Sequence, residues 1–327
     1  MLKLPAIRPA IYIALLVLAM VGTYLFKLRT QGIFACSAEG YYASTSAYLG
    51  YCNATAYGDY DHGALWFDLE PETVRFAADA DVLFIGSSRM EFGFSSQATD
   101  RWFAAAAVPH YLLGFTHTEN QAFVGPLLAR IKPRAKVYII NADQFFQDNE
   151  TGPASQILHD NDIQRRYKEK KLWQRAHRSL CTRLRAVCGH QFAYYRSREH
   201  GHWKFRGVDS NHATSVTEGP IGDQDQWDQY AALAKQFIAS LPVKRDCVIL
   251  TIVPYRDTMS AEAKAIADAV GLELVNPQLE GLRTFDGSHL DLPSAERWSQ
   301  AFFDAAGAQI RRCLGQGSTT RIAAGDL

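Results

Sequence analysis

Two short segments, far apart in the chain, carry residue types that could act together on an ester. The apolar run DVLFIG is followed by Ser87 and Ser88, and the segment FDGSHLDL contains Asp286 and His289 three positions apart. An aspartate can hold the inner N–H of an imidazole, and a histidine held in this way is oriented as a general base towards a third group. Ser88 could be that group. Each segment alone is equally typical of an ordinary turn, so the combination carries the prediction.

The elements that must position these residues alternate regularly along the chain. Runs that are apolar on consecutive positions suit strands buried on both faces, as in a parallel sheet. The alternation predicts an α/β fold with a doubly wound, flavodoxin-like, parallel five-stranded sheet in a three-layer α/β/α arrangement. We expect strands at 81–86, 110–115, 136–141, 247–255 and 272–276, and helices at about 96–107, 119–132, 225–241, 260–270 and 293–313. Sites in such sheets form where strands end at their carboxyl edge, and both segments are expected there.

At its two ends this alternating region, about residues 80–312, resembles the SGNH, or GDSL-like, hydrolase superfamily. That family has Gly-Asp-Ser after its first strand and Asp-x-x-His before its last helix. The resemblance implies that Ser88 is the nucleophile, His289 the base and Asp286 its orienting partner, with Ser87 where the family has aspartate. The variant Gly-Ser-Ser-Arg, behind an N-terminal anchor, is similar to bacterial envelope proteins that handle O-acyl groups on polysaccharides, often beside a multi-spanning O-acyltransferase.

The middle of the region departs from the family pattern. Thr118 stands where the family has the oxyanion-hole glycine, and Asn141, Asp143 and Gln144 give no clean match to its Gly-x-Asn-Asp block. Because one oxyanion donor is worth on the order of 10²–10³ in turnover, these departures bear on the mechanism. Thr118, Gln144 and Asp143 remain the candidates for this part of the site.

Two further residues follow predicted strands and have two interpretations each. Arg89 could bind an anionic group of a substrate, or it could pair with Glu91 or Asp143. His117 could line the pocket or belong only to the loop. No metal-ligand spacing of His and Cys and no glycine-rich phosphate loop is present in the sequence, so we expect no metal and no cofactor.

Near the N-terminus, the run AIYIALLVLAMVGTYLF (10–26) carries no charge. Its length lies between the core of a secretion signal and a full membrane span. The following KLRTQGIF contains no small-x-small cleavage site. This pattern favours an uncleaved single-pass anchor in a bacterial inner membrane, with the catalytic domain in the periplasm or outside. Lys plus Arg (34) equals Asp plus Glu (34), so the whole chain has no bias towards polyanions.

Six cysteines support export, because disulfides persist in oxidising compartments. The most plausible pairs are neighbours in order along the chain, and six unpaired core thiols are the alternative. The pairs are Cys36 with Cys52, Cys181 with Cys188, and Cys247 with Cys313.

A basic segment, residues 164–207, interrupts the alternation. It has thirteen Lys or Arg against Glu169 and Glu199, and its aromatic residues include Trp173, Phe192, Tyr194, Tyr195 and Trp203. It could be a solvated helical lid, or a surface that attracts anionic lipid head groups or an anionic polymer, with aromatic faces for sugar rings. Nucleic acid is not expected for an exported segment. We expect His200 and His202 to be exposed here.

These observations predict serine-dependent acyl transfer or ester hydrolysis on O-acyl groups of an envelope or exopolysaccharide glycan. The alternative is a non-catalytic SGNH-like scaffold or glycan-binding subunit that partners a membrane O-acyltransferase. The expected organisation is an anchor, a loop-rich connector, the α/β domain with its insertion, and a polar tail, at 1–29, 30–79, 80–315 (insertion 148–224) and 316–327.

Overall fold

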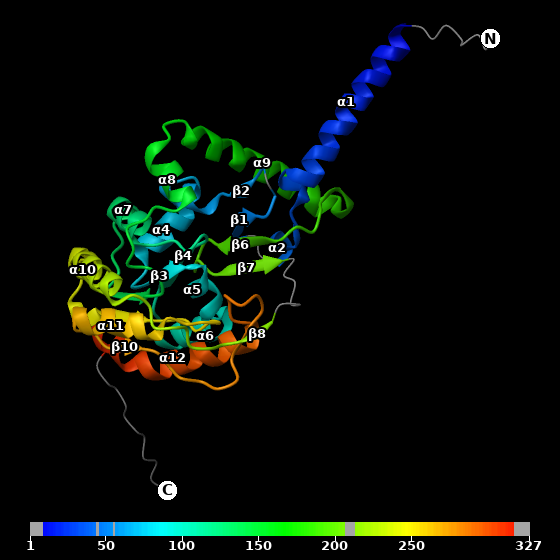
Figure 1. Cartoon of the computed structure of the whole chain (residues 1–327). Helices are drawn as coiled ribbons and strands as arrows, with labels where there is room; N and C mark the ends of the chain where they lie inside the picture. Colours follow the sequence, from blue (N-terminus) through cyan, green and yellow to red (C-terminus); the bar gives the residue numbers. More distant parts are fainter. Residues whose placement is uncertain (1–8, 44–45, 55, 207–212, 317–327) are drawn as a thin grey trace. The chain divides into compact units, whose positions relative to one another are not determined.

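The computed structural model describes residues 9–43, 46–54, 56–206 and 213–316 (Figure 1). The start of the predicted anchor, part of the predicted insertion and nearly all of the predicted tail lie outside these residues. The chain divides into two units. Unit 1 comprises 1–60, 165–195 and 204–208, and unit 2 comprises 61–164, 196–203 and 209–327.

A five-stranded parallel sheet forms the centre of unit 2, which confirms the α/β class. Its strand order is β10-β9-β5-β3-β4, and each adjacent pair is parallel. The strands are β3 (Val82–Ser87), β4 (His110–Phe115), β5 (Val137–Asn141), β9 (Val248–Thr251) and β10 (Leu274–Val275). Ser87 pairs with Phe115, and Asn141 pairs with Thr251. The carboxyl ends of these strands therefore lie at one edge of the sheet.

The fourth strand is shorter than the predicted 247–255, and this part of the prediction was wrong. β9 ends at Thr251, because the backbone beyond it makes other hydrogen bonds. The N–H of Val253 donates to Oδ1 of Asn141 at 3.0 Å. Pro254, the next residue, has no N–H with which to continue a ladder.

The predicted helices of unit 2 occur within a residue or two of their expected bounds, and several begin with a side-chain cap. Ser95, Asn120 and Asp291 each accept a hydrogen bond from a backbone N–H in the first turn of the helix that follows. The helices of unit 2 are α3 (Asp61–Trp66), α4 (Pro71–Asp79), α5 (Ser88–Gly93), α6 (Ser96–Ala106), α7 (Gln121–Ile131), α8 (Gly152–His159), α10 (Gln224–Ser240), α11 (Ser260–Val270) and α12 (Leu292–Cys313).

Aromatic side chains from α6, from α12 and from Phe94, the residue that ends α5, pack against one face of the sheet. Phe84 of β3 contacts Phe94 and Phe103, and Phe94 in turn contacts Trp298 and Phe302 of α12. Full burial of a side chain such as Phe stabilises a fold by about 1.5–3 kcal/mol. Alternate residues on the same strand, Leu83 and Ile85, are buried as well, as expected for strands covered on both faces.

Unit 1 contains more regular structure than the loop-rich connector predicted for residues 30–79. Its elements are too short to show a period in the sequence. They are α1 (Pro9–Gln31), η1 (Ile33–Ala35), α2 (Glu39–Ala43), β1 (Ala47–Cys52) and β2 (Gly58–Asp59), with α9 (Ile163–Arg183), η2 (Arg185–Val187), β6 (Ala193–Ser197) and β7 (Trp203–Arg206) from the predicted insertion. Residues 196–203, which include the end of β6 and the start of β7, are counted with unit 2. β1 and β6 are neighbours in a sheet of order β2-β1-β6-β7, so strands from two distant segments complete each other. A further pair, β8 (Thr214–Ser215) with β11 (Arg283–Thr284), is antiparallel.

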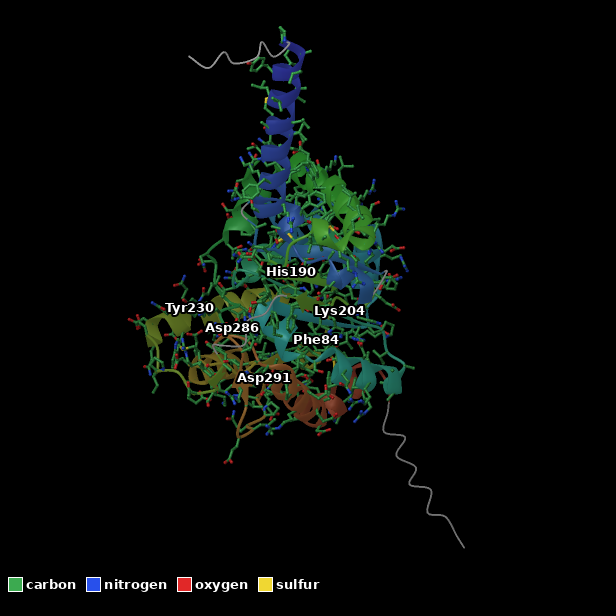
Figure 2. All side chains as sticks on the ribbon, turned by 90° about the vertical axis from the view of Figure 1, so that its right-hand side faces the viewer. Phe84, His190, Lys204, Tyr230, Asp286 and Asp291 are labelled. Atoms are coloured by element: carbon green, nitrogen blue, oxygen red, sulfur yellow. A yellow bond between two sulfur atoms is a disulfide. The ribbon has the colours of Figure 1, made fainter. Side chains whose placement is uncertain are left out.

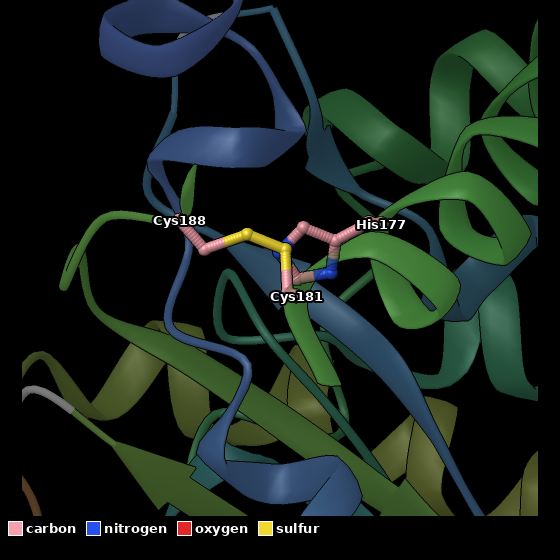
Figure 3. Close-up of side chains that lie close together, drawn as sticks. All are labelled: His177, Cys181 and Cys188. Carbon is pink, nitrogen blue, oxygen red and sulfur yellow. A yellow bond between two sulfur atoms is a disulfide. The ribbon is translucent and has the colours of Figure 1, made fainter. Parts of the chain in front are cut away.

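All six cysteines form the three predicted disulfides, and the alternative of free thiols was wrong. The bonds join Cys36 to Cys52, Cys181 to Cys188, and Cys247 to Cys313. His177 lies beside the second of these bonds (Figure 3). Because its two sulfurs are bonded to each other, they do not act as thiolate ligands beside the imidazole.

The helix α1 is apolar and long enough to cross a membrane, and none of its residues is buried. Thr23 and Thr30 donate their hydroxyls to carbonyls four residues earlier, so these polar groups are satisfied within the helix itself. A helix of this kind is either a single membrane span or a signal sequence. Together with the disulfides, it favours a location outside the cytoplasm for the folded domain.

Candidate functional site

Ser88, His289 and Asp286 form one continuous hydrogen-bonded row. The Ser88 hydroxyl lies 2.9 Å from Nε2 of His289, and Nδ1 of the same ring lies 2.7 Å from Oδ2 of Asp286. Ser88 is the first residue of α5, whereas the other two side chains come from the loop between β11 and α12. Figure 2 labels Asp286 within unit 2. The geometry is that of a hydroxyl facing an imidazole whose other nitrogen is held by a carboxylate.

Local chain geometry explains why Ser88 stands at the end of β3. Ser87 is extended and caps α5, because its side chain accepts from the N–H of Arg89 at 3.4 Å. A Cβ at Gly86 would lie 3.0 Å from Cβ of Asn141 and 3.3 Å from Cβ of Met90, so only glycine fits there without displacing them. Ser87 thus has a structural role, and Ser88 is the serine that faces His289.

The loop that carries His289 is closed by its own hydrogen bonds. Oδ1 of Asp286 accepts from the N–H groups of Ser288 and His289, at 2.9 and 2.8 Å. The N–H of Phe285 donates to the carbonyl of His289 at 3.0 Å. Gly287 has a φ of +86°, a backbone conformation that glycine adopts readily. One carboxylate therefore shapes the loop with one oxygen and orients the imidazole with the other.

Two aromatic side chains and the Asp286 carboxylate surround the His289 ring. Phe92 and Phe285 pack beside His289, with ring centroids 4.5 and 5.6 Å away. Burial alone would raise the pKa of Asp286, but hydrogen bonds and charge attraction from His289, with the backbone hydrogen bonds, lower it overall. The carboxylate stays ionised in neutral solution and can stabilise an imidazolium that forms beside it.

Of the two roles predicted for Arg89, the structure shows the pairing with Asp143. Its guanidinium pairs with the buried carboxylate of Asp143, donates to Oγ of Ser288 at 3.1 Å and lies over the ring of Tyr255 at 3.7 Å. Tyr255 also donates its hydroxyl to Asp143 at 3.0 Å. The predicted pairing partner Glu91 is engaged elsewhere. Arg89 therefore links three strand-exit loops to the residue next to His289, and sequence reasoning missed the parts played by Tyr255 and Ser288.

A second buried network of charged residues holds α5 through Glu91. Arg196 is 0% exposed and pairs with both Asp61 and Glu91, although the sequence placed it in a basic surface segment. Oε1 of Glu91 also accepts from the N–H of Gly114 at 2.9 Å. Burial raises the pKa of Glu91 to about 8, against the lowering effect of Arg196. A Cβ at Gly114 would lie 2.5 Å from Cγ of Glu91, which explains glycine there by packing.

The predicted oxyanion residues lie in loops with unusual backbone. His117, Thr118 and Gln144 all have positive φ, between 52° and 63°. His117 and Thr118 are exposed, and the Thr118 hydroxyl donates to the carbonyl of His117 at 2.6 Å. Among the described residues, no hydrogen bond joins Thr118 or Gln144 to Ser88. Asp143 is held by Arg89 and Tyr255, which both donate to its oxygens.

Histidines of the basic segment are less exposed than predicted. His202 is buried, and His200 is half-buried. His202 lies with His110 around Asp100, a cluster that no short spacing in the sequence indicates because three separate elements supply it.

Comparison of the chain with known protein families, with curated proteins and with solved structures finds no match. The class of the protein is therefore defined by its geometry alone. It is an α/β protein with a hydrogen-bonded Ser-His-Asp row at the carboxyl edge of a parallel sheet.

Proposed function

We propose that unit 2 is an SGNH-type serine esterase or O-acyltransferase domain. The observation that carries this proposal is the 2.9 Å approach of the Ser88 hydroxyl to the ring nitrogen of His289, with Asp286 on the opposite nitrogen. The sheet supports it as well. In chain order its strands read 2-1-3-4-5, the order of flavodoxin-like doubly wound sheets, in which sites form at the carboxyl edge.

The residues are placed for acyl transfer in two steps. His289 takes the proton of Ser88 as the serine oxygen attacks the carbonyl carbon of an ester, and then gives that proton to the departing alkoxide. The acyl group is now an ester of Ser88. In the second step His289 takes a proton from water or from a sugar hydroxyl, whose oxygen attacks the acyl carbon. Ser88 leaves and regains its proton from His289.

Asp286 and the Arg89 network act through His289. Asp286 fixes the ring so that Nε2 faces Ser88, and its charge stabilises the imidazolium present between the two proton transfers. Arg89 holds Ser288, the neighbour of His289, and so restrains the loop. We assign the oxyanion to backbone N–H groups at Ser88 and at the loop containing Thr118 or Gln144, because the Asp143 oxygens already accept from Arg89 and Tyr255.

The substrate we propose is an O-acylated glycan of the bacterial envelope or an exopolysaccharide. Support comes from the apolar helix α1, from the three disulfides and from the Gly-Ser-Ser-Arg variant of the nucleophile motif. An anchored domain of this kind suits an inner-membrane protein that acts in the periplasm or outside beside a multi-spanning O-acyltransferase.

The test uses the full chain in detergent with a fluorophosphonate probe, which labels activated serines covalently. We expect labelling of the peptide that contains Ser88, loss of labelling in Ser88→Ala and retention in the matched control Ser87→Ala. Turnover of p-nitrophenyl acetate should fall in Ser88→Ala by on the order of 10⁴ or more, with the melting temperature nearly unchanged. Undiminished turnover in Ser88→Ala would refute the serine mechanism. A wild-type chain that binds acetylated glycan without labelling or turnover would favour the scaffold alternative.

A further inference from the structure

A second cluster of ligand-type side chains lies away from Ser88. Asp100 of α6, His110 at the start of β4 and His202 between β6 and β7 converge, with one ligand atom from each within 4.8 Å of the other two. Oδ1 of Asp100 lies 3.0 Å from Nε2 of His202 and 3.3 Å from Nε2 of His110. All three residues belong to unit 2.

Hydrogen bonding within the protein accounts for the contact of Asp100 with His202 but is incomplete at His110. Nε2 of His110 is buried and has no hydrogen-bond partner, although Asp100 is only 3.3 Å away. The side chain of His110 is 4% exposed, so water does not replace the missing partner. A buried polar nitrogen left without a partner is unfavourable. Two imidazole nitrogens that approach one carboxylate oxygen at these distances are also placed to share a metal ion with it.

The distances fit a tetrahedral zinc site. Nitrogen and oxygen ligands at about 2.0–2.1 Å from Zn²⁺ are about 3.3 Å from each other, close to the 3.0 and 3.3 Å observed. Two imidazoles and one carboxylate are ligands that suit zinc better than magnesium or calcium. Asp100 is 48% exposed, so an ion can reach the site and a water can complete the coordination. We propose that Asp100, His110 and His202 bind one Zn²⁺.

The position of this site indicates a stabilising role. His110 begins β4 whereas Ser87 pairs with Phe115 at the strand's other end, and five residues of strand span about 17 Å. The ion would join α6 and β4 to the segment 196–203, whose other end carries Arg196, the partner of Glu91. The ring of His110 is already fixed between Phe103 and His200, with centroids 4.2 and 4.9 Å away. Zinc would thus hold in place the segment that supplies Arg196.

The test is zinc binding by the full chain in detergent after removal of metals with a chelator. We expect one Zn²⁺ per chain by calorimetric titration with zinc chloride and a melting temperature that rises with zinc. Asp100→Asn and His110→Gln should each weaken binding at least tenfold, since even outer partners of metal ligands are worth about 10–100-fold. Glu150→Gln is the matched control, because it removes an exposed pair with His159.

Asp286→Asn separates this site from the row at Ser88 and should leave zinc binding unchanged. Equal affinity in the wild type and Asp100→Asn, or no binding above the level of a protein without the cluster, would overturn the proposal. The three side chains would then be a hydrogen-bonded cluster only. Because Ser88→Ala leaves every ligand in place, the proposed esterase function and the zinc site fail independently.

A different observation concerns the surface of α9 in unit 1. Its sequence contains eight Lys or Arg against one Glu, yet Leu172 is 62% exposed and Trp173 is 41% exposed. Further exposed apolar side chains continue in the same direction along the chain, at Leu180, Leu184 and Val187. A helix with exposed apolar side chains, a tryptophan and many basic residues is typical of one that lies in a membrane interface.

Hydrogen bonds hold α9 and the segment after it close to the end of α1. Nε2 of His177 lies 3.3 Å from the carbonyl of Cys36, and the N–H of Gly189 donates to the carbonyl of Phe34 at 2.7 Å. Phe34 and Cys36 lie only three and five residues beyond Gln31, the last residue of α1. If α1 spans a bilayer, α9 is therefore beside its surface. We infer that α9 lies on an anionic bilayer, with Leu172 and Trp173 at the head-group boundary.

Trp173 makes this inference testable in the full chain reconstituted into vesicles. Brominated phosphatidylglycerol in a phosphatidylcholine bilayer should quench part of the tryptophan fluorescence, and that part should disappear in Trp173→Phe. The matched control Trp227→Phe, in unit 2, should keep it. Quenching that is the same in the wild type and Trp173→Phe would overturn the inference and place α9 in water. Neither outcome depends on whether Ser88 is reactive.

Discussion

The substitution Glu91→Gln tests how the structure supports the helix that carries Ser88. Glu91 is buried beside Arg196, which already pairs with Asp61. Oε2 of Glu91 is buried without a hydrogen-bond partner, whereas Oε1 accepts from Gly114 and Arg196. A single arginine compensates one of the two carboxylates, and burial disfavours a second charge. Because burial raises the pKa of Glu91 to about 8, we expect this carboxyl to keep its proton in the folded chain near neutral pH.

The size of the expected change in the free energy of unfolding follows from the pKa of Glu91, which burial raises from 4.5 to about 8. Below 4.5 both folded and unfolded chains carry the proton, and above 8 neither does. Between these values the folded chain binds a proton that the unfolded chain has lost, so the free energy of unfolding falls by about 1.4 kcal/mol per pH unit. The whole interval is worth about 5 kcal/mol, and the part between about pH 5.5 and 7.5 is worth about 3 kcal/mol.

Glutamine keeps the acceptor oxygen and cannot ionise, so it should remove this slope. We expect urea unfolding of wild type and Glu91→Gln to give similar stability near pH 5 and a more stable variant near pH 7.5, by about 3 kcal/mol. Other titrating groups contribute equally to both proteins and cancel in the difference. Parallel pH profiles, or a variant destabilised at pH 7.5, would show that Glu91 is ionised as a full partner of Arg196.

Three further changes test other parts of the site and fold. Asp286→Asn should lower ester turnover by on the order of 10³–10⁴ with little change in KM, because the ring loses its orienting charge; full turnover would contradict that role. Gly287→Ala should lower the free energy of unfolding by about 1–2 kcal/mol, since φ is +86° there, and an unchanged denaturation midpoint would argue against strain. The double variant Cys247→Ser, Cys313→Ser opens a loop of 66 residues and should cost about 4 kcal/mol, measured by urea unfolding without reductant.

Much of unit 2 could be predicted because its sheet is built from local signals. Consecutive apolar residues such as those of β3 and β5 identify buried parallel strands, and capping residues place the helix starts. β9 was overestimated because the apolar run continues past Thr251, while the hydrogen bond from Val253 to Asn141 depends on a residue more than a hundred positions away. The sheet of unit 1 could not be predicted, since its strands are short and the pairing of β1 with β6 joins segments more than a hundred residues apart.

The hydrogen-bonded row of Ser88, His289 and Asp286 could also be predicted from local signals in the sequence. Both of its segments are short and local, and Ser88 lies at the carboxyl edge of the parallel sheet as expected, whereas Asp286 and His289 follow β11 of the separate pair with β8. The supporting charges could not be predicted, because residue type does not tell a buried arginine from a solvated one. Arg196 lies among basic residues in sequence but is 0% exposed beside Asp61. The cluster of Asp100 and His202 was missed for the same reason: its contacts are entirely tertiary.

The contacts of Arg89 and Arg196 explain how a short helix can hold Ser88 in a fixed position. α5 has only six residues, too few to be stable alone, and its stability must come from tertiary contacts. Arg89 ties its first turn to Asp143 and Ser288, and Glu91, one turn along from Ser88, is fixed by Arg196. Because Ser288 precedes His289, the same contact that restrains the helix also restrains the base. The distance between Ser88 and His289 is thus set by the buried contacts of Arg89 and Arg196 as well as by the loops.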